Sequence, residues 1–389
     1  KNKKKEYLVD LKEKLINCEL IEIIVENNVD GFRVFETLNA RGIPLEQHEL
    51  IKNFLYSYLR SKTKRQKLDS SWNRITENIT FNNIEYFSHF ISHFCSHLYG
   101  KTKKNDEFKT IRSNVDKLKA EKLLVSLLKN SNYYSYFLEP EKLKQNNKFN
   151  DSKVFIALKY FKDLNIRQVR PLLLSLFEKF DNEKMSKKDF VACINCLEIF
   201  YFLYSTLLKN TTNTIDNSII NLSKNILSYT GESNYKYIKN ELQKYISETD
   251  KAIESFKYLG YSNKNKKFKN SSNRRVINYI FYKFEKYYDE NDEIEPKITS
   301  IEHINNDSES NDYMSYIGNL LPLSVKLNNK IADKSYDKKI EYYKKSKLFS
   351  VKEFLENNAS KNEWTNEDII NRGNAIARLG LSKIWIFDK

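Results

Sequence analysis

Four residues near the C-terminal end have the types and spacing needed for hydrolysis of a phosphate ester: Glu302, His303, Asn319 and Asn328. A neutral imidazole near pH 7 can deprotonate water without a large pKa shift. Carboxylate and amide oxygens suit a hard divalent cation that neutralises the charge on a phosphate. We therefore predict His303 as the general base and Asn319 as the catalytic residue that holds His303 or its loop through local hydrogen bonds. Asn328 and Glu302 are the predicted ligands of Mg²⁺ or Mn²⁺.

The pattern around these residues predicts the elements that position them. ITSIEHI, at residues 298–304, is typical of a strand, and IGNLLPLS, at residues 317–324, predicts a second strand. A polar loop separates the two, a helix is expected before them over residues 275–288, and a turn and helix follow. Asn328 is expected at the start of the following helix, where asparagine also acts as a cap. A strand-loop-strand-helix unit with His and Asn at these places is the skeleton of an HNH, or His-Me finger, nuclease.

Residues 295–389 resemble the C-terminal nuclease domain of the GmrSD-type, modification-dependent (type IV) restriction endonucleases. The matching positions are Glu302, His303, Ile304, Gly318, Asn319, Leu320, Leu327, Asn328, Tyr336, Lys339, Trp364, Ile369, Arg372 and Trp385. The resemblance implies a metal-dependent DNA endonuclease that defends against phage with modified DNA, in which Lys339 and Arg372 contact the DNA. The family usually has proline two residues after the His-Ile pair, whereas Asn305 and Asn306 stand here.

The segment FETLNARGIPLEQHELIKNFL, residues 35–55, is similar to the later part of the N-terminal sensor and NTPase domain of the same family. Members of that family have a DGQQR-like nucleotide-handling motif upstream, and DGFRV at residues 30–34 is not that motif. Any NTP would therefore act through an upstream part that this chain lacks. Because the chain opens on Lys1, we expect that part in a longer chain or on a partner subunit, with a homo-oligomer as the other arrangement. Asn39 and Arg41 resemble family positions, and a turn beside Gly42 explains Asn39 equally well.

The fold class predicted for the whole chain is mainly α. Residues 1–60 are expected to be a short α/β remnant of the N-terminal domain, with a strand at residues 21–26 and a helix at residues 46–60. Residues 61–270 have helical periodicity and predict a large helical domain, and residues 271–389 predict the small ββα-metal nuclease domain. The basic stretch of residues 260–275 has the composition of a linker between them.

The composition agrees with a cytoplasmic protein that binds an anionic partner. The net charge of +15 favours DNA, whose condensed counterions are released by Lys and Arg, although lysine-rich chains are often basic for no such reason. We expect no membrane association, because no apolar run approaches the roughly 20 residues of a membrane span. The N-terminus has no signal peptide, and the four cysteines are too few for a disulfide framework.

Two further motifs and two further functions compete with this interpretation. His89, His93 and His97 share one helical face with the spacing of a zinc helix, or they pack within an aromatic helix. Cys193 and Cys196 form a CxxC pair, but their apolar mid-helix setting favours two buried small side chains. The alternative functions are a catalytically decayed nucleic-acid-binding module and a helical scaffold subunit of a defence complex.

Overall fold

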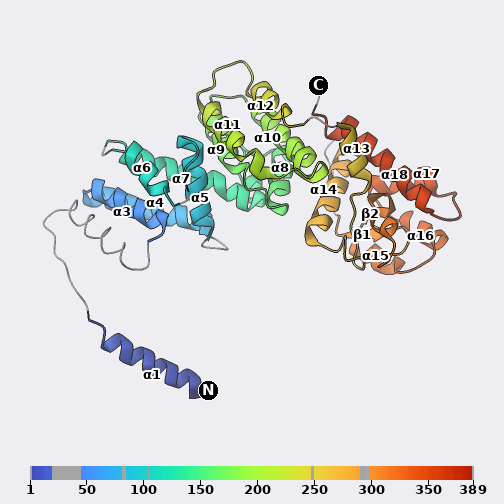
Figure 1. The fold of residues 1–389 in the computed structure, drawn as a ribbon, viewed down its shortest axis with the longest axis horizontal. Helices are drawn as coiled ribbons and strands as arrows, with labels where there is room; N and C mark the ends of the chain where they lie inside the picture. The colour runs from blue at the N-terminus through green and yellow to red at the C-terminus, as the bar shows by residue number, and fades with distance from the viewer. Residues whose placement is uncertain are drawn as a thin grey trace.

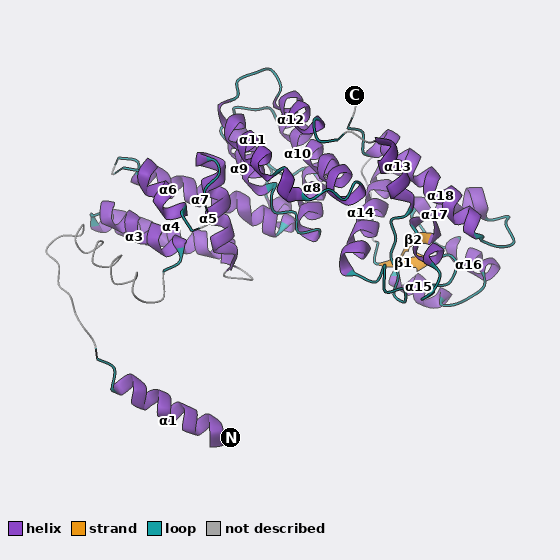
Figure 2. Ribbon diagram, viewed as in Figure 1, coloured by secondary structure: helices purple, strands orange, loops and turns teal. Residues whose placement is uncertain are grey.

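The computed structural model describes residues 2–19, 45–80, 85–103, 105–116, 118–246, 249–289, 296 and 298–387. Over these residues the protein is mainly helical, as the sequence predicts, and its strands form one hairpin near the C-terminus (Figures 1 and 2). The predicted strand at residues 21–26, the DGFRV segment, and Asn39 and Arg41 lie outside the described residues.

Helices α3 to α12 form the helical body, and Figure 1 shows them in a row that leads to the hairpin at the other end. Helix α1, Asn2–Ile16, is exposed along its described side chains. The helices of the body are α3 Gln47–Tyr58, α4 Lys62–Thr80, α5 Glu85–Tyr99, α6 Glu107–Asn114, α7 Ala120–Leu138, α8 Ser152–Asp163, α9 Arg170–Asp181, α10 Lys187–Tyr201, α11 Asp216–Ser228 and α12 Asn234–Gln243. Helix α3 matches the helix expected over residues 46–60.

Helix α10 is the central helix of the body and continues into a π-helical turn, Phe202–Leu207. Ser186 caps its start by accepting a hydrogen bond from the Asp189 amide, which satisfies one of the free N–H groups of the first turn. Its length and apolar composition would also allow it to cross a membrane, but most of its apolar window is buried inside the protein, as expected of a core helix. Cys193 and Cys196 lie inside it, buried and unpaired, and burial raises the pKa of both thiols. They are the small core side chains that the sequence favours.

The hairpin consists of β1, Ser300–His303, and β2, Leu320–Leu323, in antiparallel register with His303 opposite Leu320 and Glu302 opposite Leu321. Each face of the hairpin enters a different hydrophobic cluster. Ile301 and Leu320 join the large cluster that runs through the helical body, whereas Leu321 and Leu323 join a smaller one. The helices after the hairpin are α15 Val325–Ile331, α16 Tyr336–Tyr343, α17 Phe349–Asn358 and α18 Asn366–Leu379. Because side chains alternate along a strand, neighbouring residues of β1 lie in different environments.

The segment between α13, Thr249–Lys257, and α14, Ser271–Tyr288, is part of the hairpin region, which corrects the linker expected over residues 260–275. Gly260 forms an isolated antiparallel bridge with Tyr316, and a Cβ at Gly260 would lie 2.2 Å from the Ser315 carbonyl oxygen. Tyr261 and Phe268 are buried. Their burial outweighs the polar composition on which the linker prediction depended, and α14 begins earlier than the expected residue 275.

Two tryptophans at the end of the chain explain part of the sequence pattern there by packing. Trp364 is buried in the smaller cluster, stacked on Tyr336. Trp385 stacks on Phe202 of the helical body with ring centroids 4.5 Å apart, and its indole N–H donates to the Tyr279 hydroxyl over 2.9 Å. The final segment therefore fastens the hairpin region to the body through buried aromatic area.

Candidate active site

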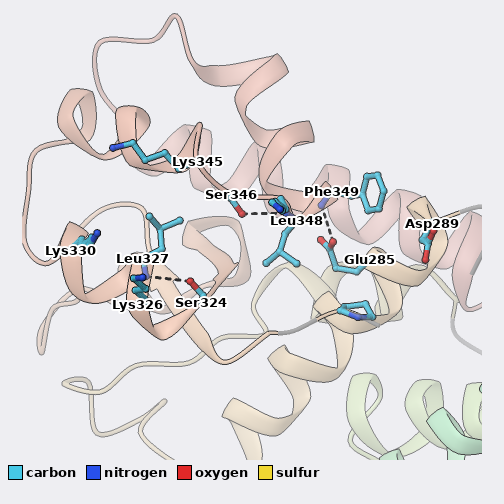
Figure 3. A pocket seen from close by; sticks show the side chains of 12 residues that line it. Glu285, Asp289, Ser324, Lys326, Leu327, Lys330, Lys345, Ser346, Leu348 and Phe349 are labelled. Atoms are coloured by element: carbon cyan, nitrogen blue, oxygen red, sulfur yellow. Dashed lines mark hydrogen bonds between the residues drawn. The ribbon is translucent and has the colours of Figure 1, made fainter. Parts of the chain in front are cut away.

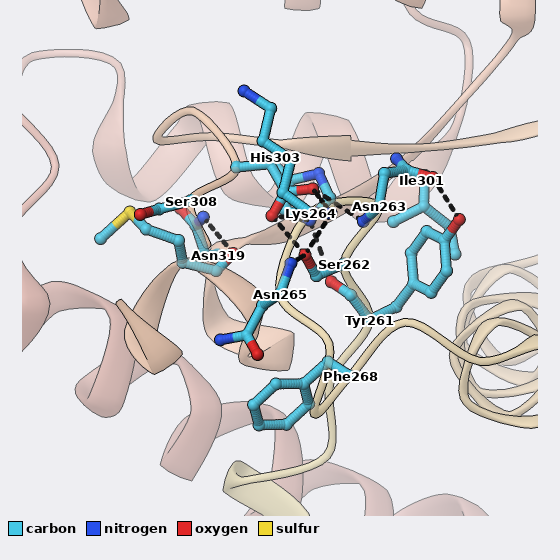
Figure 4. Close-up of polar contacts among 12 residues, drawn as sticks. Tyr261, Ser262, Asn263, Lys264, Asn265, Phe268, Ile301, His303, Ser308 and Asn319 are labelled. Atoms are coloured by element: carbon cyan, nitrogen blue, oxygen red, sulfur yellow. Dashed lines mark hydrogen bonds and ion pairs between the residues drawn. The ribbon is translucent and has the colours of Figure 1, made fainter. Parts of the chain in front are cut away.

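His303 is the last residue of β1 and lies against the loop that begins at Tyr261 (Figure 4). Its Nε2 atom is 2.9 Å from the Tyr261 carbonyl oxygen, and only 7% of the residue is exposed. A carbonyl oxygen can only accept, so Nε2 must carry the proton and Nδ1 must hold the lone pair. Nδ1 makes no hydrogen bond to a described residue and is not fully buried. The structure therefore presents one basic nitrogen of His303 to solvent.

Asp307 fixes the loop that supplies this carbonyl. Its carboxylate accepts a hydrogen bond from the Ser262 hydroxyl over 2.6 Å, from the Asn263 amide over 2.7 Å and from the Lys264 amide over 3.2 Å. Ser262 and Asn263 directly follow Tyr261 in the chain, so these bonds determine where the Tyr261 carbonyl points. Asp307 thus acts on His303 through the loop.

Burial and charge act in opposite directions on the imidazole. Burial lowers the pKa of His303 below its ordinary value, and the nearby Asp307 carboxylate, 3.8 Å from Nε2, raises the pKa in part. The net lowering favours the neutral imidazole near pH 7, which is the form that a general base requires. The charge of Asp307 would in turn stabilise the imidazolium that forms when His303 accepts a proton.

Asn319 is fully buried and holds the loop that follows His303. Its side-chain oxygen accepts from the Asn305 amide over 2.8 Å, while its side-chain nitrogen donates to the carbonyls of Asn305, over 2.9 Å, and Met314, over 2.8 Å. Asn306 stands where the family pattern has proline, and its side-chain nitrogen donates to the Asp333 carbonyl over 3.2 Å. These bonds order the loop without proline. A Cβ at the neighbouring Gly318 would lie 1.9 Å from the Ile369 carbonyl oxygen, so only glycine fits there.

Glu302 does not join His303, because the two residues are neighbours on one strand and their side chains leave it on opposite faces. The Glu302 carboxylate is buried, 2.8 Å from the Lys339 ammonium and 3.1 Å from the Tyr343 hydroxyl that donates to it. Burial raises the pKa of Glu302 and Lys339 partly offsets this rise. The predicted role of Glu302 as a metal ligand beside His303 is therefore corrected to that of a buried ion-pair partner.

Asn328 lies on the same face of β1 as Glu302. Its side-chain nitrogen donates to the Ser300 hydroxyl over 2.6 Å and to the Ile301 carbonyl over 3.1 Å. It is also not at the start of a helix, because α15 begins at Val325 and Ser324 is its cap. The structure thus does not bring Asn328 to His303, and the position predicted for it as cap and metal ligand is wrong.

Lys339 and Arg372 are also placed inside the domain, away from the DNA that they were predicted to contact. Lys339 is 1% exposed, and its ammonium bonds Glu302 and, over 2.6 Å, the His303 carbonyl. The Arg372 guanidinium donates to the carbonyls of Gly318 and Leu320, each over 2.8 Å, and burial lowers its pKa to about 10. Both cations support the hairpin backbone, which corrects their assignment as phosphate contacts.

The side chains around His303 do not form a ready site for Mg²⁺ or Mn²⁺. Both oxygens of Asp307 already accept hydrogen bonds from the loop, and the predicted ligands Glu302 and Asn328 lie on the other face of the hairpin. In the described parts of the chain, no three His, Cys, Asp or Glu residues are grouped so as to hold a metal ion. The predicted ligand set therefore does not fit a hard cation that needs several oxygen ligands.

The histidines of helix α5 are held by other side chains of the helical body. His93 Nδ1 lies 2.8 Å from the Tyr134 hydroxyl. His97 lies 2.8 Å from the Ser175 hydroxyl and 3.1 Å from the Glu178 carboxylate. His89 packs against His93, with ring centroids 6.4 Å apart. This arrangement agrees with packing on an aromatic helix.

The sequence interpretation missed Tyr261 and Asp307. Asp307 stands four residues after His303 in a polar loop, and this spacing is its only sequence signal. Tyr261 contributes a backbone carbonyl, which no residue type identifies, from a segment more than forty positions away.

One family matches the chain, over the residues that form this site. Residues 254–379 match the family described as GmrSD restriction endonucleases, C-terminal domain. No curated protein matches the chain. The match begins well before the resemblance seen from residue 295, and it includes Tyr261 and the loop that covers His303. Residues 254–379 are therefore a C-terminal domain of the GmrSD restriction endonuclease type.

Proposed function

We propose that this protein is a DNA endonuclease that hydrolyses phosphodiester bonds with His303 as the general base. The main support is the hydrogen bond from His303 Nε2 to the Tyr261 carbonyl, which leaves the Nδ1 lone pair toward solvent. The family match, which names a restriction endonuclease domain, supports the same reaction class. An HNH-type arrangement remains part of this proposal, since β1, β2 and α15 follow one another in the order that the motif requires.

In this mechanism, Nδ1 of His303 removes a proton from the attacking water while Nε2 keeps its proton on the Tyr261 carbonyl. Asp307 is a positioning residue that holds the carbonyl and stabilises the imidazolium through its charge. Asn319 holds the loop after His303. When bound, a divalent cation would neutralise charge on the phosphate. Because the predicted ligands do not converge, no step here depends on a cation held by named residues.

The test is nicking of supercoiled plasmid DNA by the full chain in Mg²⁺, in Mn²⁺ and in EDTA. We expect cleavage with either cation and none in EDTA, because hydrolysis concentrates negative charge on the phosphate. Cleavage that continues in EDTA would contradict the metal requirement. Lack of cleavage under all conditions, with DNA still bound, would support the decayed binding module instead. The divided positions of Glu302, Asn328 and His303 favour that second candidate.

We further propose that the enzyme acts in the cytoplasm in defence against phage with modified DNA. A separate N-terminal part or partner subunit would supply the sensing and NTP-dependent functions. The support is the family match together with four cysteines that form no disulfide.

Replacing Asp307 by asparagine tests its positioning role. Removing the negative charge should lower the pKa of His303 further, so the acid limb of the pH-rate profile should move to lower pH. The plateau rate should fall by up to about 100-fold, the typical effect of misplacing a catalytic group by about 1 Å. Nicking rates measured across the pH range check both effects.

Asp312→Asn is the matched control for this substitution. Asp312 bonds Asn265 and Lys267 in the same loop region but makes no contact with His303. The control should keep the parent pH profile. An unchanged profile for Asp307→Asn itself would show that Asp307 does not act on His303.

A further inference from the structure

A lysine-rimmed pocket lies on the α15 side of the domain (Figure 3). We define it by Lys326 and Lys330 of α15, Lys345 and Lys347 between α16 and α17, and the apolar side chains of Leu327 and Leu348. Its volume is about 630 Å³. Since α15 packs on the Glu302 face of β1, the pocket is separate from His303, which faces the opposite side.

The lysines of the pocket have no carboxylate partner among the described residues. All four are exposed, and none of them forms an ion pair with a described residue. The carboxylate of Glu285, on the far wall, accepts the Phe349 amide over 2.8 Å and the Ser350 amide over 2.7 Å at the start of α17. Asp289, also on that wall, is the other lining carboxylate. The lysine side of the pocket therefore keeps an excess of positive charge.

The apolar residues of the pocket lie between the lysines and the far wall. In Figure 3, Leu327 and Leu348 stand between the side with Lys330 and Lys345 and the side with Glu285. A ligand that fits must combine anionic groups spaced along one edge with a flat, less polar part. A nucleic-acid strand has this chemistry, because its phosphates bind lysines and its bases pack on apolar or aromatic side chains.

We propose that the lysine-rimmed pocket binds a stretch of nucleic-acid strand, with phosphates on Lys326, Lys330, Lys345 and Lys347 and a base against Leu327 and Leu348. This inference rests on the proposed function and adds a holding site for the substrate strand away from His303. It also locates DNA contacts on lysines that are exposed, in place of Lys339 and Arg372, which are engaged inside the domain.

The test measures binding of a fluorescent single-stranded oligonucleotide to the full chain in EDTA, by anisotropy at several salt concentrations. In the Lys326→Ala/Lys345→Ala double variant, the slope of log affinity against log salt should fall by about two, one for each lost phosphate contact. Affinity should fall by roughly an order of magnitude at low salt. The control is Lys188→Ala/Lys236→Ala, which removes two exposed lysines of the helical body and should keep the parent slope.

Leu348→Ala tests the apolar part of the pocket. It should weaken binding of a strand with bases, leave an abasic strand unaffected and keep the salt slope unchanged, because it removes contact area and no charge. Circular dichroism establishes that each variant is folded.

The outcomes separate this inference from the proposed function. If the parent binds and the lysine double variant keeps the parent slope, the pocket inference is overturned and the nuclease proposal stands. If the parent itself does not bind DNA, the proposed function fails and the pocket inference fails with it. If Leu348→Ala binds both strands as the parent does, the base contact is overturned.

Discussion

Replacing His303 by alanine is expected to lower the rate of plasmid nicking by about 10²- to 10⁴-fold, the usual contribution of a general base. The physical reason is that no other described side chain offers a neutral imidazole nitrogen at the end of β1. The measurement is the initial rate of nicking at saturating divalent cation, with binding to the same DNA measured separately. Binding should be nearly unchanged, because the buried imidazole contributes little contact surface.

His303→Gln is the variant that protects this test from a folding defect. Alanine leaves the Tyr261 carbonyl without its donor, which costs about 1–3 kcal/mol when the group is buried. Glutamine retains a side-chain N–H but has no basic nitrogen, so it should fold better and still fail to cleave.

His97→Ala is the control at a distance, since His97 is a buried histidine of the helical body. Some loss of stability with full cleavage by the folded protein is expected there. Parent-like cleavage by folded His303→Ala and His303→Gln would show that His303 is a structural histidine.

Replacing Lys339 by methionine is expected to reduce the free energy of unfolding of the C-terminal region by about 3–5 kcal/mol, as for other broken buried ion pairs. Methionine fills similar space but leaves the Glu302 carboxylate buried without its cation, and it removes the bond to the His303 carbonyl. Urea unfolding followed by tryptophan fluorescence measures the effect, because Trp364 is buried in the cluster beside this pair. The same experiment distinguishes the structural role of Lys339 from the DNA contact first predicted for it.

Two further proteins define the origin of that loss. Lys344→Ala removes a lysine whose partner Glu341 is exposed, and it should change stability by no more than about 1 kcal/mol. Adding Glu302→Gln to Lys339→Met removes the unpaired charge while keeping an acceptor for the Tyr343 hydroxyl, so much of the stability should return. No recovery in the double variant would show that the charge of Glu302 is not the cause.

The pH dependence of the Lys339→Met variant follows from the same charge. Burial already raises the pKa of Glu302, and Lys339 opposes this rise in the parent, so the pKa in the variant should be higher still. A carboxyl whose folded pKa exceeds its unfolded pKa binds more protons in the folded state, so folding is favoured as the pH falls. The stability deficit of the variant should therefore shrink on acidification toward the raised pKa.

The sequence by itself determined the elements and their order. Helical periodicity predicted the body and α3, because apolar residues that recur every three or four positions must share one buried face. The two apolar runs predicted the hairpin, and the ordered spacing from Glu302 to Trp385 predicted the family that the match over residues 254–379 identifies. Such patterns depend on local spacing along the chain, which the sequence records directly.

Only the tertiary structure decided which side chains meet. Glu302 and His303 are adjacent in the sequence, but strand alternation places the first with Lys339 and the second against Tyr261. The composition of residues 260–275 is that of a linker, whereas the buried Tyr261 and Phe268 hold this segment on the hairpin. The Tyr261 carbonyl that fixes the tautomer of His303 belongs to the backbone, which all residue types share. Its role therefore arises from the contact between distant segments and leaves no mark in the local pattern.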